Sequence, residues 1–164
     1  MENLIVHYSW SVFFLQLVLA ALLGGFLGLE RNYVGKDAGT RTFALISLGS
    51  CLFTVISVGA FQKFVTITGS SFDPSRIASQ IVAGIGFIGM AVIFRHGTNL
   101  EGVTTAASIW VAAAIGMAVG VELYILAAIA TVIAFCIQGV LRMANLEMRL
   151  EEWHKQRQKN AKKS

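Results

Sequence analysis

The 164-residue chain is poor in charged residues, in proline and in cysteine. Charged residues make up 13% of it, against about a quarter in ordinary soluble domains, so a soluble enzyme is not expected. The two cysteines, Cys51 and Cys136, lie within apolar stretches, which argues against a disulfide framework or a cysteine metal site. The sequence also offers no nucleophile–base pair and no phosphate-binding loop. We therefore expect no enzymatic activity and no cofactor.

Hydrophobic residues make up 55% of the chain, and its mean hydropathy is +0.68. They form five charge-free stretches, each close to the roughly 20 residues that a helix needs to cross a bilayer. A backbone in lipid must satisfy its own hydrogen bonds, so each stretch is expected to be helical. We predict an all-α membrane protein, a bundle of about five transmembrane helices. The predicted spans are 9–29, 42–61, 77–94, 105–121 and 123–141, followed by a basic helical tail over 142–164.

Only Glu122 separates the last two stretches, and one fused helix of their combined length would be too long for a single span. Lysine and arginine are frequent in the first connection and the tail but absent from the N-terminal segment and the fourth connection. The positive-inside rule then places the N-terminus outside and the tail in the cytoplasm. The basic tail is expected to contact membrane lipid, and nucleic acid is not an expected partner. Its apolar positions 143, 146, 150 and 153 fit either a partner helix or the membrane surface.

Glycines are concentrated inside the predicted spans, where they let helices approach closely. The run Gly84-x-Gly86-x-x-Gly89 matches the dinucleotide-binding fingerprint, but it lies within an apolar span and no strand precedes it, so we interpret it as a packing surface. Because so small a bundle leaves several glycine faces uncovered, we expect a homo-oligomer. The predicted packing glycines are Gly24, Gly25, Gly28, Gly84, Gly86, Gly89, Gly116 and Gly120.

Ionisable residues lie at the ends of the predicted spans. The simplest interpretation is that they are interfacial anchors and helix caps. Thr40 is predicted to cap the second helix, Asp73 the third, and Thr104 or Thr105 the fourth. The alternative is a functional polar cluster, and whether a metal binds there is left open because His96 and Glu101 alone are too few ligands. The candidate residues are Glu30, Arg31, Asp37, Arg41, Asp73, Arg76, Glu101, Thr104 and Thr105.

Several short motifs, taken together and in this order, resemble the MgtC/SapB family of bacterial inner-membrane proteins. They extend from about Leu22 to Gly120. The motifs are Gly28-Leu29-Glu30-Arg31, Ala38-Gly39-Thr40-Arg41-Thr42, Leu48-Gly49-Ser50, Asp73-Pro74-Ser75-Arg76-Ile77-Ala78, Gly84-Ile85-Gly86-Phe87-Ile88-Gly89 and Gly102-Val103-Thr104-Thr105-Ala106-Ala107-Ser108-Ile109-Trp110.

The resemblance implies a five-span domain in the bacterial inner (cytoplasmic) membrane. It further implies roles in growth at low magnesium, in phosphate or acid-stress homeostasis, and in the virulence-related survival of pathogens inside macrophages. The family is viewed mainly as regulatory, acting on other inner-membrane proteins such as the ATP synthase or transporters. This sequence has Met90-Ala91 after Gly89, where the family often has alanine and glycine. Many members also carry an ACT-like domain after the last span, whereas only 142–164 remain here, so we expect the membrane domain to carry the function.

Two functions remain open from the sequence. One is a non-enzymatic regulator that binds other membrane proteins through glycine-lined helix faces. The other is a transporter or channel for Mg²⁺ or H⁺, with carboxylates such as Asp73 and Glu30 at its two mouths. The predicted spans contain no ionisable side chain, and such a side chain usually marks an ion pathway, so the regulator is favoured.

Overall fold

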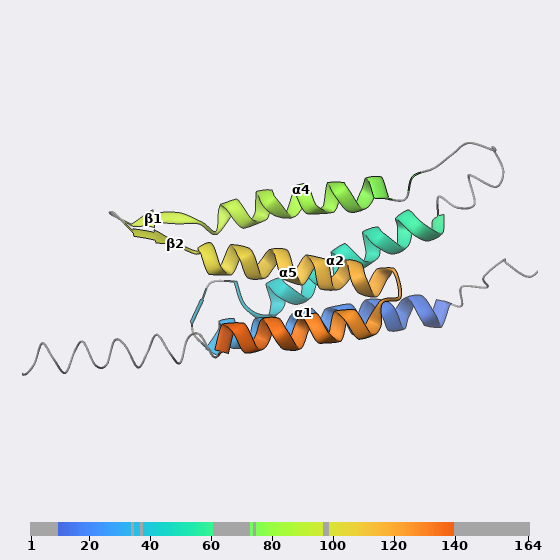
Figure 1. The fold of residues 1–164 in the computed structure, drawn as a ribbon, viewed down its shortest axis with the longest axis horizontal. Coiled ribbons are helices and arrows are strands. Elements are labelled where there is room, and N and C mark those ends of the chain that lie inside the picture. The colour runs from blue at the N-terminus through green and yellow to red at the C-terminus, as the bar shows by residue number, and fades with distance from the viewer. Residues whose placement is uncertain are drawn as a thin grey trace, which may run out of the picture.

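The computed structural model describes residues 10–33, 35–36, 38–60, 73, 75–96 and 99–139. These residues form five helices and one short β-hairpin (Figure 1). This confirms the predicted all-α bundle of about five helices, to which the hairpin is an unpredicted addition. The helices are α1 (Trp10–Tyr33), α2 (Thr40–Val55) with its π-helical extension η1 (Ile56–Ala60), α4 (Ser75–Ala91), α5 (Val103–Gly120) and a last helix, Tyr124–Gly139. The antiparallel strands are β1 (Phe94–His96) and β2 (Asn99–Glu101).

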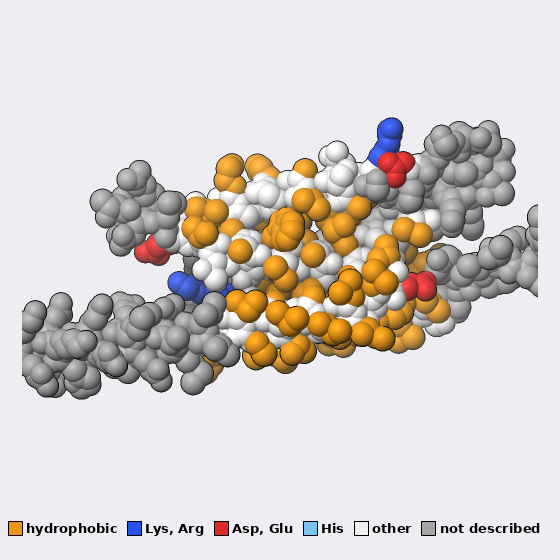
Figure 2. All heavy atoms as spheres, in the orientation of Figure 1, with side chains coloured by type: hydrophobic (Ala, Val, Ile, Leu, Met, Phe, Trp, Pro, Cys, Tyr) orange, Lys and Arg blue, Asp and Glu red, His pale blue; other side chains and the backbone are white. Residues whose placement is uncertain are grey.

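Three of the helices are long and apolar enough to cross a membrane, namely α1, the segment Thr40–Val58 and α5. The other two, α4 and the last helix, are apolar but shorter. Figure 2 shows hydrophobic side chains covering the middle of the visible face, with Lys, Arg, Asp and Glu gathered at its two ends. This distribution is that of a membrane protein. Helix α4 ends at Ala91, and Phe94 lies in β1 rather than in a span.

The bundle has two distinct ends (Figure 1). We call the end that carries the β-hairpin the hairpin end: α1, α4 and the last helix finish there, and α2 and α5 begin there. At the opposite end α1 and α4 begin and α5 finishes. Which end faces the cytoplasm remains a prediction from the distribution of Lys and Arg.

The connection between α5 and the last helix is a tight turn centred on Glu122, whose φ of 65° is in the left-handed region. The amide of Glu122 donates to the carbonyl of Val119 at 3.0 Å, and that of Leu123 donates to Ala118 at 2.9 Å. These two bonds form a Schellman motif, which satisfies the last carbonyls of α5. The predicted separation of the last two helices at Glu122 is therefore correct.

The core lies where α1, α2 and α5 pack on one another. Leu27, Phe43, Ile109 and Ile115 are almost completely buried there. The last helix contacts α1 through the rings of Phe26 and Phe135, whose centroids are 4.7 Å apart. Helix α4 lies at the edge of the bundle and packs mainly against α5 (Figure 1). Three helices thus share a common core, and α4 is the most exposed of the five.

The predicted helix caps were wrong for α2 and α5. The N-cap of α2 is Gly39 and that of α5 is Gly102, so Thr40 and both threonines at 104 and 105 lie in the first turn of their helices. Gly102 has a φ of 84°, and a Cβ there would collide with the carbonyl oxygen of Val92, which leaves glycine as the residue that fits. Helix α4 begins at Ser75; Pro74 and the tail over 142–164 lie outside the described residues.

Candidate functional site: a polar cluster at the hairpin end

The connection between α1 and α2 is closed by tight contacts at the hairpin end. A Cβ on Gly28 would lie 2.7 Å from the Cα of Thr40, so the two backbones touch. The side-chain amide of Asn32 donates to the hydroxyl of Thr40 at 3.0 Å, and Asn32 also covers Gly39 so closely that any side chain there would clash. The start of α2 is consequently held against the end of α1.

Glu30 and Arg31 form a buried ion pair at the end of α1. Their side chains are 8% and 7% exposed; Nε of Arg31 donates to Oε2 of Glu30 at 2.5 Å, and Nη2 of Arg31 forms an ion pair with the same oxygen at 2.5 Å. A charge withdrawn from water in this way needs an opposite charge close by. Glu30 and Arg31 therefore neutralise each other at the hairpin end.

Three further predicted residues lie exposed at the hairpin end, namely Arg41, Glu101 and Thr104. They belong to three different elements: Arg41 is in the first turn of α2, Glu101 is the last residue of β2 and Thr104 is in the first turn of α5. Thr105 is buried beside them, with 6% of its surface exposed. The structure thus gathers these residues at one end of the bundle. Asp37, also predicted, lies outside the described residues.

Asp73 and Arg76 lie where α4 begins, at the opposite end of the bundle (Figure 1), and both are exposed. The amide of Arg76 donates to the carbonyl of Asp73 at 3.3 Å, as in the first turn of a helix. The structure therefore separates this pair from the cluster around Glu30 by the length of the bundle. They form a second polar edge and cannot share one site with Glu30.

Sequence reasoning missed a set of polar side chains that are buried between the helices. The amide of Gln138 donates to the hydroxyl of Ser108 at 2.9 Å, which links the last helix to α5, and Gln16 donates to the hydroxyl of Tyr124 at 3.2 Å. Ser47 is fully buried, and its hydroxyl has no hydrogen-bond partner among the described residues. The buried members on α2 and its extension η1 recur at helical spacing, which was a usable signal: Ser47, Ser50, Thr54 and Ser57.

The predicted packing glycines fall into two groups. Four allow close approach of helices: Gly24 and Gly28 bring α1 onto α2, and Gly116 and Gly120 bring α5 onto α2. A Cβ on Gly24 would lie 2.5 Å from Cβ of Ser47, and one on Gly116 would collide with the carbonyl oxygen of Ser47. The other group makes at most ordinary contacts. Gly25 and Gly89 have neighbours at 3.6 Å, and nothing lies within 4 Å of a Cβ on Gly84 or Gly86.

The hairpin end presents charged and hydroxyl side chains at its surface. Among the described residues, His, Cys, Asp and Glu nowhere form a group of three that could hold a metal ion. In the described part of the chain, the exposed side chains at this end include the cations Arg41 and Lys36, the carboxylate of Glu101 and the hydroxyl of Thr104, near the Glu30–Arg31 pair. Such an array suits charge-assisted contacts with another macromolecule.

Comparison with known proteins places the chain in a family. A model described as the MgtC family matches residues 17–146. YhiD of Escherichia coli K12, whose name reads "putative magnesium transporter", is 40% identical over 144 residues, which cover 88% of this chain and 67% of YhiD. Protein MgtC of Salmonella typhimurium LT2 is 41% identical over 132 residues, 80% of this chain and 53% of that protein. Protein MgtC of Brucella abortus 2308 is 40% identical over 123 residues, 75% of this chain and 48% of that protein.

The chain thus spans about two thirds of YhiD and about half of the length of the two MgtC proteins. No solved structure matches it. The family match covers most of the chain, including the helices α2, α4 and α5 and the residues of the hairpin end. On this basis the chain belongs to the MgtC family.

Proposed function

We propose that the chain is a non-enzymatic regulator in the bacterial inner membrane that serves magnesium homeostasis by acting on other membrane proteins. The wider roles implied by the family resemblance, in acid stress and virulence-related survival, belong to the same proposal. The hairpin end would face the cytoplasm, where Arg41, Glu101 and Thr104 are accessible to a partner. An ATP synthase or a transporter is the kind of partner that the resemblance suggests.

The observation that carries this proposal is the distribution of charge along the described helices. Their ionisable groups lie at the two ends, and those that are buried, Glu30 and Arg31, neutralise each other. The polar groups deeper in the bundle are hydroxyls and amides. A pathway for Mg²⁺ or H⁺ normally includes ionisable residues inside the membrane, because they replace lost hydration or relay protons.

The alternative function is transport of Mg²⁺, and the name of YhiD favours it. Asp73 and Glu30 would then mark the two mouths of a path, one at each end of the bundle. The described residues place no carboxylate between them. Transport by this chain would therefore have to rely on hydroxyls, amides and backbone carbonyls, which is a weak ligand set for a strongly hydrated cation.

Growth at limiting magnesium tests the regulator proposal through one exposed arginine. In a strain lacking its own relative of this chain, the wild type is expected to restore growth and Arg41→Gln to restore little of it. Loss of one charge-assisted contact weakens partner binding by about tenfold. Growth rate and the amount of chain in isolated membranes are measured together.

Arg76→Gln is the matched control. Arg41 and Arg76 are each the second residue of a helix, and both are exposed, but they lie at opposite ends of the bundle. Arg76→Gln is expected to restore growth like the wild type. Equal growth of both variants, at equal membrane levels, would contradict recognition at the hairpin end.

A further inference from the structure

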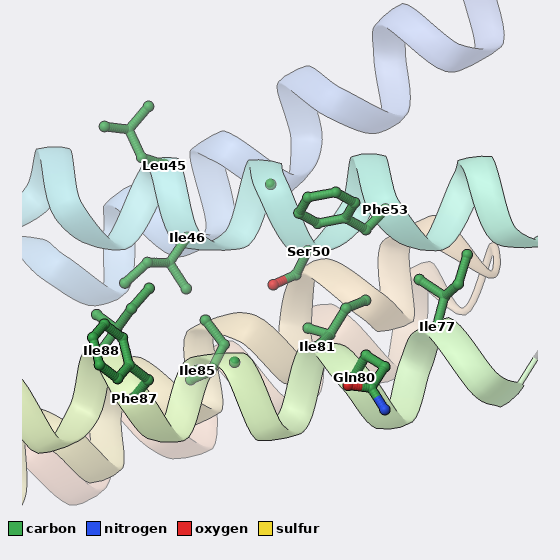
Figure 3. A pocket seen from close by; sticks show the side chains of 12 residues that line it. Leu45, Ile46, Ser50, Phe53, Ile77, Gln80, Ile81, Ile85, Phe87 and Ile88 are labelled. Carbon is green, nitrogen blue, oxygen red and sulfur yellow. The ribbon is translucent and has the colours of Figure 1, made fainter.

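An open groove runs between α2 and α4, with a volume of about 910 Å³ (Figure 3). Its walls are almost entirely apolar; Phe53 contributes from α2 and Phe87 from α4. Helix α4 packs mainly against α5, and most of its described side chains are exposed, with Ile81 and Ile85 as its buried large apolar residues. Within a membrane this groove opens to the bilayer, so its occupant must come from the membrane phase.

Two polar side chains distinguish the groove from a lipid-facing surface. Ser50 is 3% exposed, and Figure 3 shows its hydroxyl directed into the groove. No described residue gives that hydroxyl a hydrogen bond; the bond that Ser50 does make is accepted by its backbone carbonyl from Thr54. Gln80 lies across the groove on α4 and is exposed. An acyl chain would leave both groups unsatisfied, whereas a polar side chain would satisfy them.

The backbone of the groove is also accessible. Gly49 on α2 and Gly84 on α4 both line it, and nothing lies within 4 Å of a Cβ at either position. Bare backbone of this kind lets another helix approach to close van der Waals distance, which is the main source of helix association in lipid. Small residues combined with hydrogen-bonding side chains favour a helix over a lipid chain as the occupant.

Helix α4 itself carries a face that suits the groove between α2 and α4. Gln80, Ala83, Gly84 and Phe87 follow the i, i+3, i+4, i+7 spacing of a packing seam, and all four are exposed. Two copies inserted in the same direction are related by a two-fold axis along the membrane normal, so equivalent residues lie at equal depth. Ser50 and Gln80 line the same groove (Figure 3), and pairing between copies requires the long side chain of Gln80 to reach along it to the level of Ser50. The second copy would thus bring a second glutamine amide to the groove, where no described residue gives the Ser50 hydroxyl a hydrogen bond.

We propose that the groove between α2 and α4 is a self-association surface into which α4 of a second copy packs, with Gln80 of that copy as the hydrogen-bond partner of Ser50. The arrangement is isologous, so each copy fills the groove of the other. The inference goes beyond the proposed function and does not depend on it.

Energy transfer between donor- and acceptor-labelled copies of the 164-residue chain in liposomes measures this association. The wild type is expected to associate. Gly84→Leu fills the groove wall and is expected to weaken association by about tenfold or more. Ser50→Ala removes the hydrogen bond and is expected to weaken it by about three- to fifteen-fold.

The matched control is Gly86→Leu, the same change two residues along α4. Gly86 has the same open surroundings as Gly84 but does not line the groove. The Gly86→Leu variant is expected to associate like the wild type, and circular dichroism is expected to show that all variants are folded. Equal weakening by both leucine variants would overturn the proposal, as would a wild type that stays monomeric at every lipid ratio. A monomer would point to a helix of a different protein, or a lipid, as the occupant.

Discussion

Gly116→Leu is expected to prevent assembly of the helical bundle. Gly116 lies on α5 where its backbone touches the backbone of α2, and even a Cβ would collide with the carbonyl oxygen of Ser47. That carbonyl belongs to a helix that also packs against α1 at Gly24, so it has little room to move away. Overpacking against a fixed backbone costs about 3 kcal/mol or more. Thermal unfolding in detergent, followed by circular dichroism, measures the loss.

Gly86→Leu serves as the control for this prediction as well. Both positions are helical glycines in apolar helices, and nothing lies within 4 Å of a Cβ on Gly86. The control is expected to unfold at the temperature of the wild type. If Gly116→Leu were as stable as Gly86→Leu, the close contact between α2 and α5 would be refuted.

Glu30→Gln is expected to destabilise the chain by about 3–5 kcal/mol, because it leaves the charge of Arg31 buried without a counter-charge. Both side chains are more than nine-tenths buried, so water cannot replace the missing carboxylate. Thermal unfolding in detergent, followed by circular dichroism, measures the loss of stability. The unfolding temperature is expected to fall, and the helix content of the folded state is expected to stay the same.

The double variant Glu30→Met/Arg31→Met separates charge from packing. Replacing a buried ion pair by apolar side chains of similar size is often neutral or stabilising. The double variant is therefore expected to be about as stable as the wild type. A double variant that is as unstable as Glu30→Gln would show that the two side chains are needed for other contacts, and the account of a self-neutralised pair would fail.

The number of helices could be predicted from the sequence because it depends on length and apolarity alone. Charge-free stretches of bilayer length become helices wherever they pack. The break at Glu122 has a local cause, because the tight turn there ends α5 with its own backbone hydrogen bonds. The helix starts could not be predicted in the same way. They depend on Gly39 and Gly102, whose use as caps is set by contacts with Asn32 and Val92 in neighbouring elements.

The candidate site was only partly predictable for a similar reason. The sequence indicated which charged residues lie near the ends of helices, but not which of them are buried together. Adjacent residues on a helix project in different directions, so the pairing of Glu30 with Arg31 had no sequence signature. The groove beside α4 likewise depends on how far that helix stands from α2, which is a property of the assembled bundle.

Ion flux into liposomes tests the central claim, that this chain regulates other membrane proteins and does not carry ions. The purified wild type, shown to be folded by circular dichroism, is reconstituted with a Mg²⁺-sensitive or a pH-sensitive dye inside, beside Asp73→Ala and protein-free liposomes. Under a gradient of Mg²⁺ or H⁺, the account predicts the same flux in all three. Flux through the wild type above that of protein-free liposomes, and its loss in Asp73→Ala, would contradict the account and identify a transporter.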